Sequence, residues 1–195
     1  MISTKYSKNK TNCGNKLRTF SSFKQTFSRE KYLSLKDPVQ RRALSRFRLS
    51  AHKLNVETGR YNSKNRYVKP EERICTSCTL GVCEDERHFL IDCPLYDNLR
   101  SNLYSAISET NVHFCSYTPI QKFTWLMTTE DLNCLSVIAS FIHKAMKLRE
   151  SANLVWKTLV YGPFTFQTCT INRHVWEVGL AKFYSLRGAI LQIIV

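Results

Sequence analysis

Several features of common enzyme families are missing from this sequence. Its 195 residues include only six glycines, and none of them forms a P-loop, a dinucleotide-binding glycine pattern or a G-x-S-x-G elbow. No apolar run is long enough to span a bilayer, and the N-terminus lacks the apolar stretch of a secretory signal. We therefore expect an intracellular protein of the nucleus or cytoplasm that is neither secreted nor held in a membrane.

Acidic residues are scarce in the N-terminal part. Lys and Arg number 29 against 15 Asp and Glu, which gives a formal charge of +14. Residues 1–73 hold 19 of the basic and five of the acidic residues, so the whole surplus lies there and the remainder is neutral. A basic arm joined to a neutral body is typical of proteins that contact phosphate, so we expect RNA or DNA as the partner.

The spacing of apolar residues predicts a mainly α-helical protein. Amphipathic patterns predict helices at about residues 17–27, 38–58, 94–109, 119–127 and 129–149. We expect residues 1–15 to be a flexible basic tail and residues 16–150 to be a small helical domain. Residues 151–195 have few charges and no clear period, which indicates an extension of uncertain structure with weak candidate strands.

The predicted helix over residues 38–58 carries most of the candidate phosphate contacts. Asp37 is a good N-cap, and Pro38 suits the first helical position. Apolar residues then recur every three or four positions, which predicts one buried face, and Gly59 is a suitable C-terminal cap. The basic residues on this helix or just after it are Arg41, Arg42, Arg46, Arg48, Lys53 and Arg60. We expect them to contact nucleic-acid phosphates, although a solvated helix face is the simpler alternative.

The residues with the clearest chemistry are three cysteines and one histidine. Cys75, Cys78, His88 and Cys93 have the spacing C-x2-C-x9-H-x4-C. Zn²⁺ prefers a tetrahedral set of thiolate and imidazole ligands, and a C-x2-C turn places two sulfurs on one ion. A closed set of four leaves no position for a reacting water. We therefore predict one structural Zn²⁺ in a Cys₃His knuckle, with a short β-hairpin or loop between the ligand pairs.

Two alternatives stay open on spacing alone. The cysteines can be ordinary buried residues, although four ligands in one short polar segment favour a metal. Cys83 can replace Cys93, because residues 75, 78, 83 and 88 also have a compact knuckle spacing. Cys93 is favoured, since a predicted helix begins directly after it and fixes its position. Glu84, Asp85 and Glu86 lie between the ligand pairs. They can be metal ligands themselves, but a solvated loop or contact with the ligands is favoured.

Three stretches of the sequence resemble one family. They are LSRFRLSAHKLNVETGRY (44–61), ERICTSC (72–78) and EDERHFLIDCPLYDNLR (84–100). They resemble the zinc-binding region at the C-terminal end of reverse transcriptases from LINE-type (non-LTR) retrotransposons, and the resemblance extends over residues 16–150. It implies Cys75, Cys78, His88 and Cys93 as the zinc ligands, and it leaves Cys83 at a position that usually holds no ligand.

The catalytic motifs of that family are absent from the sequence. Its enzymes are RNA-directed DNA polymerases with an endonuclease and a polymerase ahead of this region, whereas here there is no Y-x-D-D motif to hold two Mg²⁺ ions. We therefore expect no enzymatic activity, and we predict a zinc-stabilised module that binds RNA or DNA. The alternatives are a protein-interaction or scaffolding module that docks on a separate reverse transcriptase or nuclease domain, and a non-functional remnant of a mobile element.

Overall fold

The computed structural model describes residues 17–161, except 25 and 27. Within this range the chain forms helices and loops, with two isolated antiparallel bridges in place of a sheet. Its α-helices are α1 (Arg18–Phe23), α2 (Pro38–Arg48), α3 (Asn55–Thr58), α4 (Asp97–Ser108), α5 (Pro119–Thr128) and α6 (Leu132–Tyr161). The mainly α-helical class predicted from the sequence is confirmed. The predicted tail over 1–15 and most of the extension over 151–195, with its candidate strands, lie outside the described residues.

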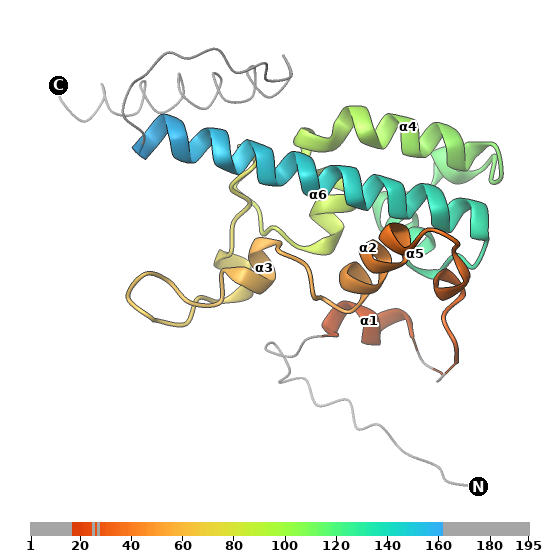
Figure 1. Ribbon diagram of the computed structural model, residues 1–195, viewed down its shortest axis with the longest axis horizontal. Helices are drawn as coiled ribbons and strands as arrows, with labels where there is room; N and C mark the ends of the chain where they lie inside the picture. Colours follow the sequence, from red (N-terminus) through yellow and green to blue (C-terminus); the bar gives the residue numbers. More distant parts are fainter. Residues whose placement is uncertain (1–16, 25, 27, 162–195) are drawn as a thin grey trace, which may run out of the picture.

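The longest helix, α6, packs against both α2 and α4. Figure 1 shows it running along the molecule with α4 on one side and α2 on the other. It begins directly after Asp131, whose carboxylate accepts a hydrogen bond from the backbone N–H of Cys134 at 2.8 Å. It continues to Tyr161, so the helix end predicted at residue 149 is wrong, and the expected domain boundary at residue 150 falls inside a helix. Among the described helices, none has the length and apolar character of a membrane span.

Helix α2 starts where the sequence predicts and ends ten residues early. The carboxylate of Asp37 accepts a hydrogen bond from the N–H of Val39 at 2.8 Å, and Pro38 occupies the first turn. The helix ends at Arg48, and the chain then turns at Ser50, which has a left-handed φ of 52°. An irregular segment leads from this turn to the separate short helix α3. The single helix predicted over residues 38–58 is therefore wrong.

The apolar pattern behind that prediction is satisfied in a different way. Leu44 and Phe47 are buried on α2, and Leu54 is also buried because the segment after the turn returns to the core. Ala51, which a continuous helix would place on the same face, is exposed. Spacing alone does not distinguish these two routes into the core, since both bury the larger apolar side chains.

Two other helix starts follow the sequence patterns. Helix α4 is preceded by a 3₁₀ turn over Pro94–Tyr96, and its buried face includes Leu103 and Ile107. Helix α5 begins with a capping box: the hydroxyl of Thr118 accepts from the N–H of Gln121 at 3.3 Å, and the Gln121 side chain accepts from the N–H of Thr118 at 2.9 Å. The helices predicted to start near residues 94 and 119 are therefore confirmed.

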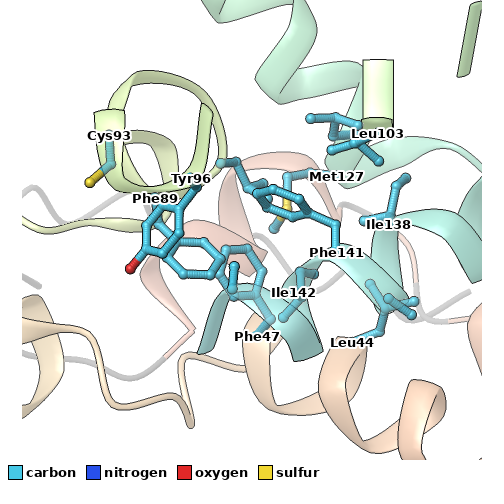
Figure 2. Close-up of a cluster of buried hydrophobic side chains, with 14 of the residues drawn as sticks. Leu44, Phe47, Phe89, Cys93, Tyr96, Leu103, Met127, Ile138, Phe141 and Ile142 are labelled. Atoms are coloured by element: carbon cyan, nitrogen blue, oxygen red, sulfur yellow. The ribbon is translucent and has the colours of Figure 1, made fainter. Parts of the chain in front are cut away.

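An aromatic cluster joins the cysteine-containing segment to the helices. Phe89 is fully buried, and its ring centroid lies 5.4 Å from that of Phe47, 4.7 Å from that of Tyr96 and 6.0 Å from that of Phe141. Figure 2 shows these rings packed against residues of α2 and α6, with Cys93 at the edge of the cluster. Burying one such ring contributes about 1.5–3 kcal/mol, so Phe89 fixes the adjacent residues to the helical core.

Candidate metal centre

The four side chains predicted as ligands form one buried cluster. All four belong to residues 70–96, and we call this stretch of the chain the ligand segment. The ligand atoms of Cys75, Cys78, His88 and Cys93 all lie within 4.8 Å of one another. Sγ of Cys78 lies 3.4 Å from Nε2 of His88. Ligands arranged tetrahedrally around one Zn²⁺ at about 2.0–2.3 Å are separated by about 3.3–3.8 Å. The cluster can therefore hold a metal ion with small adjustments.

The first two cysteines lie on a turn that backbone hydrogen bonds close. The N–H of Cys75 donates to the carbonyl oxygen of Val82 at 2.8 Å. Beside this bond is the isolated antiparallel bridge between Ile74 and Cys83. The connection between the ligand pairs is otherwise a loop, so of the two predicted alternatives the loop is observed and the β-hairpin is not formed.

Each ligand sulfur accepts a hydrogen bond from the backbone N–H two residues further along the chain. The donors to Cys75, Cys78 and Cys93 are Ser77, Leu80 and Leu95, respectively. The Ser77 nitrogen lies 3.4 Å from Sγ of Cys75. Each bond lowers the pKa of its thiol, because a thiolate accepts a hydrogen bond more strongly than a neutral thiol does. The backbone at all three positions is thus arranged to stabilise thiolates.

The second ligand pair is held on one wide turn. Residues 88–92 form a π-helix, in which the N–H of Cys93 donates to the carbonyl oxygen of His88 at 2.8 Å. Such turns contain an extra residue and are frequent at functional sites. The carboxylate of Asp85 accepts a hydrogen bond from the N–H of His88 at 2.7 Å, which fixes the start of the turn. Both ligands therefore face the first pair while Phe89, between them, enters the core.

The three thiols share one enclosed space, so their ionisation is linked. A hydrogen bond from Cys93 lowers the pKa of Cys75 to about 3. The same hydrogen bond, together with burial, raises the pKa of Cys93, and burial raises the pKa of Cys78. Without a metal, the cluster therefore favours one thiolate and two neutral thiols. A divalent cation at its centre would stabilise all three cysteines as thiolates.

The surroundings of His88 and Cys83 show which atoms can act as ligands. Nε2 of His88 faces Sγ of Cys78, whereas Nδ1 is buried and has no hydrogen-bond partner among the described residues. Cys83 instead donates a hydrogen bond from Sγ to the carbonyl oxygen of Pro70 at 3.0 Å. The structure therefore groups Cys93, and not Cys83, with the other three ligands.

Glu84 and Glu86 are buried, so the solvated loop, one of the two alternatives predicted for the acidic residues, is wrong for them. Asp85 is half-buried and accepts a hydrogen bond from the ligand residue His88, as the other alternative predicts. Glu84 is 1% exposed, and its carboxylate accepts hydrogen bonds from Nε and Nη2 of Arg149, both at 2.6 Å. It also accepts a hydrogen bond from the N–H of Asn55 at 2.7 Å. Glu84 thus ties the ligand segment to α6 and to the first residue of α3.

Glu86 forms a second buried link. It is 2% exposed and accepts hydrogen bonds from Nε2 of His52 at 2.8 Å and from the hydroxyl of Ser50 at 3.1 Å. The N–H of Leu54 donates to Nδ1 of His52 at 3.4 Å, so the ring N–H that Glu86 accepts is on Nε2. The turn that ends α2 is therefore held against the ligand segment by Glu86.

Arg100 and Arg149 hold the ligand segment in place, although neither is among the predicted site residues. Arg100 donates to the carbonyl oxygens of Cys93 at 2.7 Å and Leu90 at 2.9 Å, which fixes the backbone around the second ligand pair. Both arginines lie on the apolar stripe of a helix, Arg149 seven residues after the buried Ile142. A charge at an apolar position is the sequence signal that indicates a buried partner.

The basic residues predicted to contact phosphate do not form one continuous stripe. Arg48 is buried, where it pairs with Glu30 at 2.9 Å and its guanidinium lies 5.1 Å from the ring centroid of Tyr32. Burial lowers the pKa of Arg48, although the negative charge of Glu30 opposes this shift. Because its side chain is enclosed by these groups, Arg48 does not present its charge to a phosphate backbone.

Two more of these cations are held by neighbouring groups. Nη1 of Arg41 donates to the carbonyl oxygen of Lys36 at 2.9 Å, which holds the segment before α2. Arg60 forms an ion pair with Glu57 at 2.5 Å. Both side chains are partly exposed, so they contribute to the positive potential but are weaker candidates for direct contact.

The remaining three cations line one groove. Arg42, Arg46 and Lys53 are exposed and border a groove of about 600 Å³ between α2 and α6. Its other side includes His143 and Glu150, and Glu150 pairs with Lys53 at 2.9 Å. An exposed ion pair of this kind contributes at most about 1 kcal/mol, so Lys53 can exchange it for another anion. We call this the basic groove.

Comparison with known proteins adds no family assignment. No family model, no curated protein and no solved structure matches this chain. The resemblance to the C-terminal region of LINE-type reverse transcriptases therefore rests on the quoted motifs alone and stays a prediction.

Proposed function

We propose that this protein is a zinc-stabilised module that binds nucleic acid, without catalytic residues of its own. The observation that carries the proposal is the buried Cys₃His cluster, whose ligand atoms lie within 4.8 Å of one another. Three thiolates and one imidazole in a tetrahedral set favour Zn²⁺ over the oxygen-seeking cations Mg²⁺ and Ca²⁺. A set closed by four protein ligands suits a structural ion, which supplies folding free energy to the residues that hold it.

Three features of the chain support zinc in particular. The ligand sulfurs each accept a backbone hydrogen bond, which suits thiolates. Nε2 of His88 lies 3.4 Å from Sγ of Cys78, a separation that suits two ligands of one ion. Arg100 holds the carbonyl group of Cys93, so the surroundings of the cluster orient a ligand residue.

Nucleic acid is the proposed partner because of where the cations lie. Arg42 and Arg46 extend from one helix into the basic groove, and Lys53 joins them from the following segment. The zinc ion would act indirectly, since the ligand segment holds the turn after α2 through the Glu86–His52 contact. Removing the metal should therefore disturb the groove as well as the cluster. The resemblance to the LINE-type region agrees with this function.

The zinc content of the purified full chain is the first test. We expect one Zn²⁺ per chain by mass spectrometry, and a Co²⁺-substituted protein with absorption bands typical of tetrahedral thiolate coordination. Cys93→Ser should lose the ion and the bands, whereas Cys83→Ser should keep both. Loss of metal in the Cys83→Ser protein and retention in the Cys93→Ser protein would contradict the proposed ligand set.

Binding to RNA and DNA is the second test. Fluorescence anisotropy should show binding that weakens steeply with salt, each phosphate contact adding about 0.7–0.9 to the slope of log K against log salt concentration. Arg42→Glu combined with Arg46→Glu should abolish binding. Lys144→Glu combined with Lys147→Glu, two exposed residues of α6 outside the groove, changes the net charge equally and should have a much smaller effect. Equal losses in both variants, or binding unaffected by either, would contradict the assignment of the basic groove as the contact surface. A zinc-loaded chain that binds neither RNA nor DNA at low salt would favour the protein-interaction alternative.

A further inference from the structure

The loop between α3 and the ligand segment carries two exposed aromatic side chains. Tyr61 is 61% exposed and Tyr67 is 53% exposed, whereas most large aromatic residues described in this chain are buried or partly buried. Figure 1 shows the loop after α3 projecting away from the packed helices. Tyrosine rings exposed to this degree on a projecting loop are available to a ligand.

The two tyrosines are held in a fixed relation. They face one another in an isolated antiparallel bridge, and their ring centroids lie 6.2 Å apart with the planes inclined at 74°. The N–H of Val68 donates to the carbonyl oxygen of Arg60 at 2.9 Å, and the N–H of Asn62 donates to that of Arg66 at 3.0 Å. The rings are thus presented by an ordered turn, which lowers the entropic cost of using them as a binding surface.

The two rings differ in what covers them. The guanidinium of Arg73 lies 5.4 Å from the ring centroid of Tyr67. Arg73 is itself buried, and it donates to the carbonyl oxygens of Val68, at 2.8 Å from Nη2, and of Val56. Tyr67 is therefore anchored to the body of the protein through Arg73, and it supports Tyr61, the more exposed ring.

Positive charge surrounds these rings. The stretch from Gly59 to Lys69 contains four basic residues and no acidic residue. Three of them, Lys64, Arg66 and Lys69, are exposed and form no ion pair with the residues that the structure describes. Aromatic rings interleaved with cations suit a ligand that combines planar π-systems with regularly spaced negative charges.

We propose that the ring of Tyr61 stacks on an unpaired base of single-stranded nucleic acid, whose phosphates contact Lys64 and Arg66. This inference rests on the proposed function and specifies the form of nucleic acid that the protein prefers. A duplex keeps its bases stacked inside the helix, out of reach of a side-chain ring, whereas a single strand exposes base faces. Stacking tolerates any base, so the loop gives a preference for strandedness without reading a sequence.

The test compares two oligonucleotides of equal length and charge, one with normal bases and one with abasic sugars at the central positions. The zinc-loaded full chain should bind the normal strand about tenfold more tightly, since stacking on one aromatic residue is worth about that factor. Tyr61→Ala should remove the preference and leave the affinity for the abasic strand unchanged. Tyr61→Phe should keep the preference, because the ring and not the hydroxyl stacks. Tyr61→Leu should lose the preference, because leucine is apolar but has no ring to stack.

The cations of the loop give a matched control. Lys64→Gln combined with Arg66→Gln should weaken the binding of both strands by the same factor, because both strands carry the same phosphates. Zinc content and far-ultraviolet circular dichroism should match those of the native chain in every variant. Equal affinity for the two strands in the native chain, or a preference that Tyr61→Ala leaves intact, would overturn the inference while the basic groove could still bind. Failure to bind either strand would overturn this inference and the proposed function together.

Discussion

The ligand segment and the helical body, which comprises α2, α4, α5 and α6, are built in opposite ways. In the helical body, apolar side chains such as Leu135 and Ile138 are buried and charged ones are mostly exposed. Between residues 70 and 87 the order is reversed. Ile74, Leu80 and Val82 are exposed there, whereas the buried residues are Arg73, Cys75, Ser77, Cys78, Glu84 and Glu86.

This difference shows where each region obtains its stability. Apolar burial yields about 25 cal/mol per Å², and it can hold helices together without further help. The first part of the ligand segment buries polar groups, which is unfavourable unless each finds a partner. Its partners are the proposed metal, for the thiols, and residues of distant elements, for the two glutamates. The ligand segment therefore depends on the rest of the molecule more than the helical body depends on it.

Removing the metal should show the difference between the two regions most clearly. We expect chelation of the zinc-loaded full chain to expose residues 74–84, since structural zinc contributes on the order of 10–16 kcal/mol to small zinc-binding units. Helix α6 should persist because its face buries apolar side chains from α2 and α4. Native-state hydrogen exchange measures both: the amides of Cys75 and Glu84 should lose protection, whereas those of Leu135 and Ile138 should keep it.

The Cys93→Ser protein should resemble the chelated native chain in this measurement. The Cys115→Ser protein, which changes an exposed cysteine outside the cluster, should match the zinc-loaded one. If α6 loses protection together with residues 74–84, the two regions form one cooperative unit and the distinction between them is wrong.

The same difference explains what the sequence could predict. In the helical body, local rules were sufficient for the helix starts: Asp37 and Pro38 start α2, and Thr118 with Gln121 starts α5. The grouping of the four predicted ligands could also be predicted from the sequence. Their spacing is a local pattern, and a metal of one size imposes the same geometry in many folds.

Two of the errors, the end of α2 and the burial of the acidic residues, come from contacts between residues far apart in the chain. The turn at Ser50 is held by Glu86, 36 residues later. The apolar residues continue to recur every three or four positions through residue 54, so the local pattern gives no sign of the turn. The burial of Glu84 likewise depends on Arg149, 65 residues away. A run of acids in a polar segment ordinarily indicates a solvated loop, and only the partner reverses that interpretation.

Breaking the link between the regions should have the second-largest effect. Glu84→Gln leaves the buried guanidinium of Arg149 without its carboxylate, and loss of one partner of a buried pair costs about 3–5 kcal/mol. Denaturant unfolding monitored by circular dichroism measures this loss in the zinc-loaded chain. Combining Glu84→Gln with Arg149→Met should recover part of the stability, because the unpaired charge is then removed.

The neighbouring ion pair provides the control for that prediction. Glu150→Gln removes the partner of Lys53 in a pair of similar length, 2.9 Å, whose side chains are exposed. Its effect should stay below about 1 kcal/mol. Similar losses for Glu84→Gln and Glu150→Gln would mean that the buried pair does not join the ligand segment to α6 in the way proposed.

The smallest expected effect concerns the helical body alone. Asp131→Ala removes the carboxylate that caps α6 and should lower the free energy of unfolding by about 1 kcal/mol at neutral pH. The hydrogen bond from the N–H of Cys134 lowers the pKa of Asp131. A carboxyl whose pKa is lowered by folding stabilises the protein above its ordinary pKa, about 3.9, and loses this contribution as the pH falls through the lower, folded value.

The difference in stability between the native chain and the Asp131→Ala protein should therefore be full at pH 7 and shrink below about pH 4. Denaturant titrations at several pH values measure it, with Glu130→Ala as a neighbouring substitution that leaves the cap intact. Asp131→Asn should keep most of the stability at every pH, since an amide oxygen also accepts the hydrogen bond but does not titrate. A difference that stays constant from pH 7 to pH 3 would mean that the carboxylate charge does not contribute. Hydrogen exchange in the ligand segment at pH 7 should not change in any of these three proteins, because the cap belongs to the region that apolar burial holds together.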